Sequence, residues 1–243
     1  MKLVFQSFFF IFTGSKFKTH MQQTKKPLHI IWPIAIIVAI LTIDQIIKIA
    51  VKTHMTLGES SYLNWGWWKI KWFQIKFIEN PGMALGIDLP WRFGKMTLSL
   101  FRIIAICGIT WYMINLYKTK AHNGLLICLS VILAGAIGNI IDSVLYGVLF
   151  SESTYTTVAE FLPEGGGYAS LLHGQVVDML YFPIINTKLP DWFPVWGGRS
   201  FVFFRPIFNV ADSSISVGVA LILIFQKRFF KDHKKPSYAK ASA

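Results

Sequence analysis

The sequence predicts a helical membrane protein, with four transmembrane helices that carry a small extracytoplasmic β-sheet and a long extracytoplasmic loop or lid. Of its 243 residues, 53% are hydrophobic and only 15% are charged, whereas a soluble domain carries about a quarter charged residues. The apolar residues also gather in runs close to the ~20 residues that cross the hydrocarbon core. These two observations together predict an integral membrane protein.

Three parts follow along the chain. Residues 1–28 form a basic cytoplasmic leader, 29–228 the four-helix domain and 229–243 a basic cytoplasmic tail. Residues 1–20 hold an apolar stretch too short to span a membrane, and no small-residue cleavage site follows it. Because Met21 opens a more ordinary basic leader, residues 1–20 are either an over-called start or an interfacial anchor.

Four apolar runs are predicted to cross the membrane, near 30–50, 95–117, 124–142 and 208–226. The net charge is +12, and its lysines and arginines concentrate in the two tails and the 118–123 loop. The positive-inside rule therefore places both termini in the cytoplasm. These clusters suit anionic lipid headgroups rather than nucleic acid, because no nucleic-acid-binding motif is present. Four lysines of the first outer segment count against this orientation: Lys52, Lys69, Lys71 and Lys76.

The two outer segments differ in pattern. Within residues 51–91, Trp68, Ile70 and Trp72 alternate with lysines, and this period of two predicts strands. Tryptophan beside lysine suits a sheet lying on the membrane surface, and a hairpin packed on the helices is the alternative. Residues 143–207 are rich in Gly and Pro, so loops with short ordered pieces are expected there, including a lid.

Polar side chains recur in pairs inside the apolar runs. Asp44 and Lys48 are four residues apart and so share a helix face. The pairs Asn139 with Asp142 and Asn209 with Asp212 are each three apart, again on one face. In the predicted topology all three pairs lie at the same depth, near the outer membrane boundary.

Two outer residues are candidates to join these pairs. Asp178 stands in the apolar stretch "HGQVVDMLYFP", and Asn80 opens an Asn-Pro-Gly turn that can supply hydrogen bonds. Each feature also has a structural explanation when taken singly: an ion pair for Asp44 and Lys48, helix–helix hydrogen bonding for Asn139 and Asp142, a helix-start carboxylate for Asp212, and an exposed loop acid for Asp178. Their convergence favours a functional site, since ionisable residues in membranes are usually functional.

Two carboxylates held close together cannot both ionise easily, so they share a proton. One can then act as a base toward water while the other donates a hydrogen bond to a carbonyl, as in aspartic proteases. His173 has no nucleophile beside it in the sequence. Cys107 and Cys128 lie in apolar runs without metal-ligand spacing, and both are predicted to be buried. No metal ion and no cofactor are expected.

Five motifs stand in the order "DQIIK", "NPGMALG", "GNIID", "HGQVVDML" and "FNVADSSISVG". From about residue 30 to 228 the chain thereby resembles the lipoprotein signal peptidases (signal peptidase II). The resemblance implies an aspartic endopeptidase of the bacterial inner membrane that removes signal peptides from diacylglyceryl-modified prolipoproteins. Cleavage would fall just before the lipidated cysteine. A monomer is expected, with lipid-modified prolipoproteins and membrane lipids as its partners.

Specific residues are implied by the same resemblance. The family's catalytic pair maps onto Asp178 and Asp212. Its supporting and substrate-binding residues map onto Asp44, Lys48, Asn80, Gly82, Asn139, Asp142 and Asn209. The family's outer β-cradle and periplasmic helix would suit 51–91 and part of 143–207, with the active site near the outer face.

The chain departs from the family pattern in three places. Ser143 stands where "GNxxD" is usually followed by Arg, so the salt bridge of that Arg is absent or replaced. Met83 and Leu85 fill two places of the glycine-turn motif, which usually holds smaller residues. Additions near 147–172 and 184–204 would alter the lid or the outer surface.

Two other functions stay open at this point. One is a four-span transporter or scaffold with a proton or cation path through Asp44, Asp142 and Asp212. The inner halves of the predicted spans are apolar, which counts against a path across the membrane. The other is a catalytically inactive member of the same family, suggested by Ser143 and opposed by the presence of both aspartates.

Overall fold

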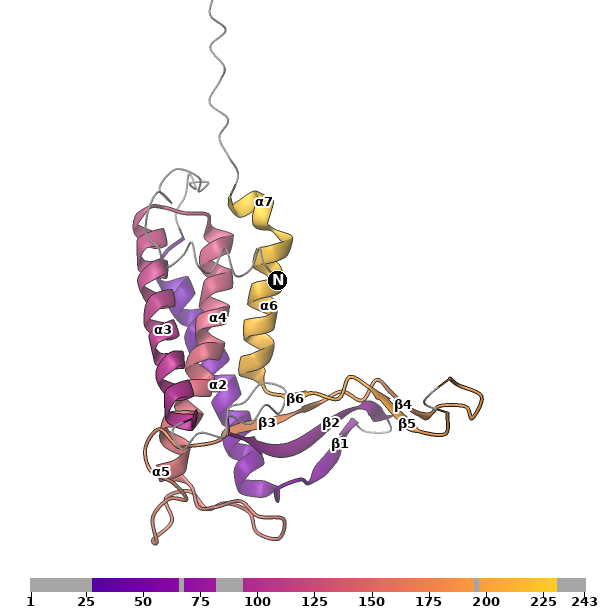
Figure 1. Ribbon diagram of the computed structural model, residues 1–243. Helices are drawn as coiled ribbons and strands as arrows, with labels where there is room; N and C mark the ends of the chain where they lie inside the picture. Colours follow the sequence, from indigo (N-terminus) through magenta and orange to yellow (C-terminus); the bar gives the residue numbers. More distant parts are fainter. Residues whose placement is uncertain (1–27, 66–67, 82–93, 195–196, 231–243) are drawn as a thin grey trace, which may run out of the picture.

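A bundle of long helices meets a small β-sheet at one end in the computed structural model, which describes residues 28–65, 68–81, 94–194 and 197–230 (Figure 1). The long helices are α2 (Ile31–His54), α3 (Gly94–Lys118), α4 (Asn123–Ile141) and α6 (Val210–Ile224). A π-helical turn (Asp142–Tyr146) and α5 (Gly147–Leu149) continue α4, and α7 (Gln226–Phe229) follows α6. The chain therefore crosses the length of the bundle repeatedly.

Three of these helices are long and apolar enough to cross a membrane within the described part of the chain: α2, α3 and the stretch from α4 through α5. Large apolar side chains such as Trp32, Phe101 and Trp111 are exposed on their outer faces, where lipid would cover them. The prediction of apolar spanning helices is confirmed for these three. At 15 residues α6 is shorter than a full span, so the fourth crossing stays a prediction.

Helix boundaries shift little from those predicted, except that α2 continues to His54, four residues beyond the expected end. Cys128 is buried on α4 as predicted. Cys107 is exposed on α3, so that prediction was wrong. An apolar run does not show which of its side chains face lipid, because both faces of such a helix are apolar.

The sheet has the strand order β1-β2-β3-β6, with antiparallel neighbours throughout. Its strands are β1 (Ser60–Trp65), β2 (Trp68–Asn80), β3 (Val176–Tyr181) and β6 (Ile207–Phe208). The strands predicted within 51–91 are confirmed. The lid predicted within 143–207 stays a prediction.

Strand β3 was expected only as part of a loop-rich segment, and it lies instead in the interior of the sheet. Four consecutive residues from Val176 to Met179 are buried, so both faces of the strand are covered. A strand buried on both faces shows no polar alternation, and periodicity therefore does not reveal it. This strand carries Asp178.

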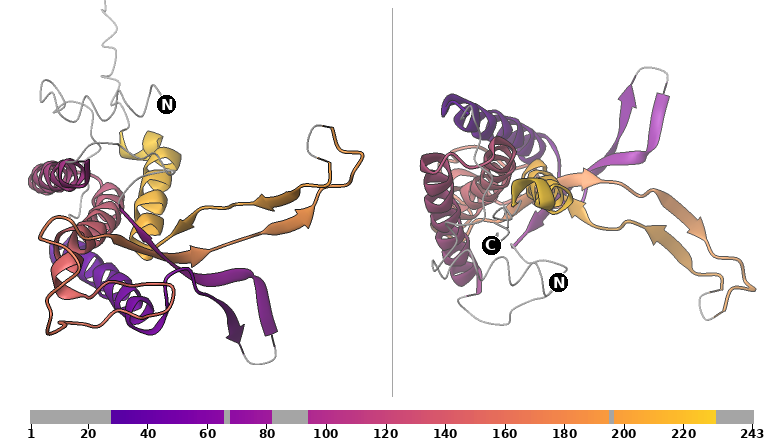
Figure 2. Two further views of the ribbon diagram at one scale, coloured as in Figure 1. Left: turned by 60° about the horizontal axis from the view of Figure 1, so that its bottom comes forward. Right: turned by 90° about the horizontal axis from the view of Figure 1, so that it is seen from above.

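A second, two-stranded sheet joins β4 (Ile185–Lys188) to β5 (Ser200–Phe203). This hairpin projects sideways from the end of the bundle, across the direction of the helices (Figures 1 and 2). It corresponds to the addition predicted near 184–204.

Helix α4 packs against α2, α3 and α6. Glycine permits the approach of α6, because a Cβ atom at Gly135 would lie 2.2 Å from the carbonyl oxygen of Ala211. At Gly138 a Cβ would lie 2.8 Å from a carboxylate oxygen of Asp44. The small-residue stripe of α4 thus brings the start of α6 close to α2.

Replacing Gly135 with Ala is expected to destabilise the protein by about 1–3 kcal/mol, because the new methyl group overlaps backbone atoms of α6. The thermal unfolding midpoint in detergent measures this change. Gly165→Ala is the control, since a Cβ there meets no atom within 4 Å. Equal unfolding midpoints for the two variants would contradict the close packing of α4 on α6.

Two apolar clusters lie at opposite ends of α4. One contains Leu125, Leu133 and Phe229, and the other contains Tyr146 and Phe150 with residues of α2 and the sheet. The polar residues of α4 lie between these clusters. The site described next is therefore enclosed by apolar packing on both sides.

Candidate active site

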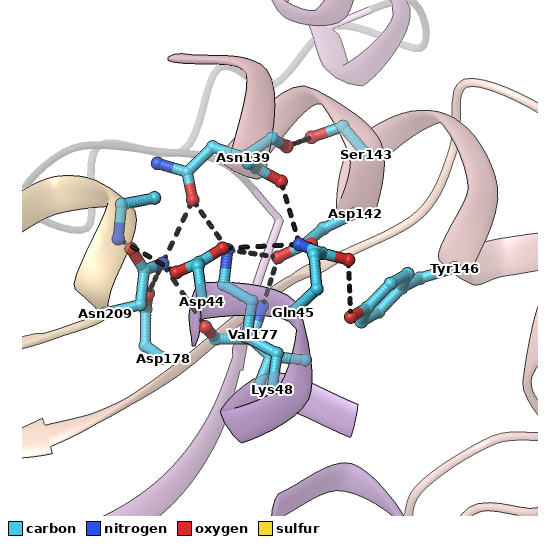
Figure 3. Close-up of polar contacts among 12 residues, drawn as sticks. Asp44, Gln45, Lys48, Asn139, Asp142, Ser143, Tyr146, Val177, Asp178 and Asn209 are labelled. Carbon is cyan, nitrogen blue, oxygen red and sulfur yellow. Dashed lines mark hydrogen bonds and ion pairs between the residues drawn. The ribbon is translucent and has the colours of Figure 1, made fainter. Parts of the chain in front are cut away.

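Eight of the nine predicted site residues belong to one network of hydrogen bonds and ion pairs at the sheet end of the bundle, part of which Figure 3 shows. They come from three helices and two strands: Asp44 and Lys48 from α2, Asn80 from β2, Asn139 from α4 with Asp142 directly after it, Asp178 from β3, and Asp212 from α6 with its cap Asn209. Gly82 lies outside the described residues, as do Met83 and Leu85. The network joins residues far apart in the sequence.

Lys48 is the cation of this network. Its ammonium group lies 2.8 Å from a carboxylate oxygen of Asp44 and 2.8 Å from one of Asp142, and all three side chains are almost completely buried. It also donates a hydrogen bond to Asn139 Oδ1 at 3.0 Å. A buried ammonium group needs such partners, because desolvation otherwise opposes its charge.

The carboxylates of Asp44 and Asp142 also accept hydrogen bonds from backbone N–H groups of other elements. Asp44 Oδ1 accepts a hydrogen bond from the backbone N–H of Ala211 at 2.8 Å, at the start of α6. Asp142 Oδ2 accepts one from the N–H of Val177 at 3.3 Å, on β3. The cluster around Lys48 therefore positions the two elements that carry Asp178 and Asp212.

Asn209 connects the two candidate catalytic carboxylates. Its side-chain oxygen accepts a hydrogen bond from the N–H of Asp212 at 2.8 Å, and Asp212 accepts one in return from the N–H of Asn209. This capping box begins α6. The side-chain amide of Asn209 donates to Asp178 Oδ1 at 2.8 Å. The chain between the two aspartates returns through β6, beside β3, and so brings Asn209 to Asp178.

Each of the two candidate catalytic carboxylates also accepts a hydrogen bond from another asparagine side chain. Asn139 donates from Nδ2 to Asp212 Oδ1 at 2.8 Å. Asn80 donates from Nδ2 to Asp178 Oδ2 at 3.1 Å. Because Lys48 donates to Asn139 Oδ1, the amide of Asn139 is oriented with its nitrogen toward Asp212. Both carboxylates are thus held in fixed positions by neutral donors.

The protonation of Asp178 differs from that of an ordinary aspartate. Burial raises the pKa of its carboxyl to about 7, and the negative charge of Asp212 acts in the same direction. The hydrogen bonds from Asn80 and Asn209 favour the ionised form and oppose this rise. Asp178 can therefore hold a proton close to neutral pH, as one member of a proton-sharing pair does.

Two polar contributions were missed in the sequence. Gln45 donates to Asp142 Oδ1 at 3.0 Å and accepts from the hydroxyl of Tyr146 at 3.1 Å. Its position between Asp44 and Lys48 in an apolar run was the available signal. Arg102 on α3 donates to Ser143 Oγ at 2.9 Å, within electrostatic range of Asp142, Asp178 and Asp212. A guanidinium group from α3 thus reaches Ser143 in the π-helical turn after α4.

Lys52, in the last turn of α2, is not a solvent-exposed charge. It is fully buried, forms an ion pair with Glu79 on β2, and donates to Ser153 Oγ at 2.9 Å. The rings of Phe150 and Tyr168 face its ammonium group at 5.5 and 5.0 Å. Lys52 therefore joins α2 to the sheet and to the segment after α5. Because its charge is paired inside the protein, it is not evidence for or against an orientation in the membrane.

A bundle of apolar helices with a buried, carboxylate-centred polar site at one end defines the class: an integral membrane protein with a polar site at one end of its helix bundle. Two solved structures of bacterial membrane enzymes share this fold. One is 24% identical with a TM-score of 0.57, covering 88% of this chain and 99% of the solved chain. The other is 25% identical with a TM-score of 0.54, covering 84% and 97%.

Sequence comparison identifies the family within this class. The model of signal peptidase (SPase) II matches residues 36–228. A lipoprotein signal peptidase of Porphyromonas gingivalis is 50% identical over 195 residues, which are 80% of this chain and 82% of the relative. One of Amoebophilus asiaticus is 39% identical over 75% of this chain and 72% of the relative. The chain belongs to the signal peptidase II family of bacterial membrane peptidases.

Proposed function

We propose that the protein is an aspartic endopeptidase that removes signal peptides from diacylglyceryl-modified prolipoproteins and cleaves just before the lipidated cysteine. The bridge formed by Asn209 carries the proposal, because it holds Asp178 and Asp212 in one site. The names of the relatives support the substrate class. A site at the membrane boundary suits a peptide bond that lies beside a lipid anchor.

The two carboxyl groups take different roles. Asp212, at the positive N-terminal end of α6, accepts two hydrogen bonds and takes the role of the base. It takes a proton from water as the water oxygen attacks the scissile carbonyl carbon. Asp178 gives its proton to the carbonyl oxygen, which forms a tetrahedral diol. Asp212 then gives its proton to the amide nitrogen as the C–N bond breaks, and Asp178 takes a proton from one diol hydroxyl, leaving a new carboxyl group and a free amine on the lipidated cysteine.

The remaining polar residues position this pair. Asn139, Asn209 and Asn80 donate to the carboxylates, while Asp44, Lys48 and Asp142 hold the elements that carry them. These are positioning roles rather than acid–base roles. Gly82 remains a proposed substrate contact from the resemblance alone.

In the proposed topology α6 is a fourth crossing, both termini are cytoplasmic and the sheet lies on the outer face. The basic tails and the 118–123 loop support this orientation. Pairing of Lys52 with Glu79 removes one of the four lysines that opposed it. In this topology the site lies at the periplasmic face of the bacterial inner membrane.

Cleavage of a defined precursor tests the proposal. Purified protein is incubated with a diacylglyceryl-modified prolipoprotein and with the same precursor lacking the lipid, each with and without a cyclic-peptide inhibitor of the family. We expect cleavage of the lipidated precursor alone, before its cysteine, and loss of that cleavage with inhibitor. Cleavage of neither precursor would refute the proposal and would favour a transporter, a scaffold or an inactive family member.

The activity is expected to fall as pH rises through about 7, because that pKa governs the proton on Asp178. Above it the pair loses its shared proton and carries two negative charges, so no group can protonate the carbonyl oxygen. Initial rates at lipidated precursor concentrations well below KM, from about pH 5 to about pH 9, measure the fall in kcat/KM, which reports ionisations of the free enzyme. A rate that rises steadily across this range would contradict the assignment of the proton to Asp178.

Replacing Asn80 with Ala tests whether Asp178 is the group that governs this fall in activity with pH. The hydrogen bond from Asn80 favours the ionised form of Asp178 and so lowers its pKa. Its removal is expected to move the descending limb to higher pH. An unchanged limb in this variant would show that a group other than Asp178 governs it.

A further inference from the structure

The β4–β5 hairpin has one apolar face, as its strand register shows. Ile185 lies opposite Phe203 and Thr187 opposite Phe201, while Asn186 and Lys188 lie opposite Val202 and Ser200. Because directly opposed residues share a face and neighbours alternate, Ile185, Phe201 and Phe203 are on the same side. They are 47%, 39% and 51% exposed. The hairpin therefore presents uncovered apolar side chains on one face.

An uncovered apolar face needs an explanation in this hairpin. A two-stranded ribbon is marginally stable in water by itself, and it gains stability when its apolar face is covered by another layer. The exposure of Ile185 and Phe203 shows that the rest of the described chain does not supply that layer. Something outside the described chain must cover the face.

The position of the hairpin indicates what covers it. The chain passes from β5 through β6 directly to Asn209, where the apolar helix α6 begins, so the base of the hairpin lies at the sheet end of the bundle. Phe204 has a positive φ of 65°, which is unusual for a bulky residue and marks the bend between β5 and β6. Both views in Figure 2 show the hairpin extending away from the bundle, and Figure 1 shows it crossing the helix direction. A hairpin that crosses the direction of membrane-spanning helices is parallel to the membrane surface.

The remaining side chains of the hairpin suit a membrane interface. Trp192, near the tip, is 79% exposed. Lys188, Arg199 and Arg205 are also exposed, against the single exposed acid Asp191. Tryptophan and basic residues together are typical of the headgroup region, where indole rings settle and cations meet lipid phosphates. At the base, the rings of Phe182 and Phe208 stack with a centroid distance of 5.6 Å.

We propose that residues 184–194 and 197–205 form an interfacial arm, which lies on the membrane at the sheet end of the bundle with Ile185, Phe201 and Phe203 in contact with lipid. The arm binds the lipid surface itself, through an apolar face in the headgroup and upper acyl region and cations at phosphate depth. This inference rests on the membrane location of the bundle and not on the proposed peptidase activity. It extends the contact between protein and bilayer well beyond the helices.

Single-cysteine reporters test which face of the arm meets lipid. In a full-length background carrying Cys107→Ala and Cys128→Ala, an environment-sensitive fluorophore is attached at Phe201→Cys or Phe203→Cys. The matched positions on the other face are Asn186→Cys and Ser200→Cys. Each protein is placed, one copy per disc, in lipid nanodiscs of phosphatidylethanolamine and phosphatidylglycerol, with nitroxide lipids as quencher. We expect at least about threefold stronger quenching at positions 201 and 203 than at 186 and 200.

Three results would contradict the proposed contact between the interfacial arm and lipid. Weak quenching at all four positions would place the hairpin in water, and equally strong quenching at all four would show that it has no lipid-facing side. Quenching at positions 201 and 203 that is weak in discs prepared with two copies, where the copies can pair, would assign the apolar face to a second copy of the chain.

Hydrogen exchange tests the same proposal on the unmodified protein, so its result does not depend on whether the cysteine variants fold correctly. Backbone amides of 185–188 and 200–203 should exchange more slowly in nanodiscs than in a lipid-free amphiphilic polymer, whereas those of 164–167 should not change. Equal exchange of the hairpin in both environments would also count against the proposal.

Discussion

Asp178→Asn and Asp212→Asn are each expected to lower the rate of prolipoprotein cleavage on the order of 10³-fold or more, because an amide cannot share or transfer the proton that the mechanism requires. The change preserves shape. In Asp178→Asn, Oδ1 can still accept from Asn209, and the amide of Asn80 can turn to present its oxygen to the new nitrogen. Both variants should therefore insert and fold. Single-turnover cleavage of the lipidated precursor measures the loss.

The control for these variants is Asp191→Asn, which makes the same chemical change at an exposed position of the hairpin. It should retain full activity. Thermal unfolding of all three variants separates a chemical defect from a folding defect. Activity within about tenfold of the unmodified protein in Asp178→Asn or Asp212→Asn would refute the pair as the source of acid–base catalysis. Low activity with an unfolded protein would instead assign that aspartate a structural role.

The polar pairs of the apolar runs were the most predictable part of the site. Asp44 with Lys48 and Asn209 with Asp212 were placed on common helix faces by spacing alone, and the ion pair and the capping box follow those spacings. The reason is local: residues three or four apart on a helix are neighbours whatever the rest of the fold does. The common depth of the pairs followed from the lengths of the apolar runs.

Contacts between distant segments were not predictable in the same way. The position of Asp178 beside Asn80, which lies 98 positions earlier in the sequence, depends on pairing between β2 and β3, and the hydrogen bond from Val177 to Asp142 joins β3 to the turn after α4. A strand buried on both faces shows no alternation, so β3 was not foreseen. Lys52 was interpreted as a topological charge because its partner, Glu79, lies on a strand whose register the sequence does not specify.

Lys48→Met is expected to be the most destabilising single change in the network, with a loss of about 3–5 kcal/mol. Met keeps much of the volume of Lys but removes the charge that Asp44 and Asp142 share. Two carboxylates are then left close together and buried, without a cation. The hydrogen bond to Asn139 is lost as well, so the amide that donates to Asp212 is released and activity should fall together with stability.

The control and the rescue follow from the same contacts. Lys118→Met, at an exposed position at the end of α3, should leave the unfolding midpoint and the activity unchanged. Adding Asp142→Asn to Lys48→Met removes one of the two uncompensated carboxylates and should restore part of the lost stability. It should restore little activity, because Asn139 still lacks the donor that orients it toward Asp212. If Lys48→Met unfolds at the same temperature as Lys118→Met, the buried ions do not hold α2, α4 and β3 together, and the packing of α4 through its glycines must position the two aspartates instead.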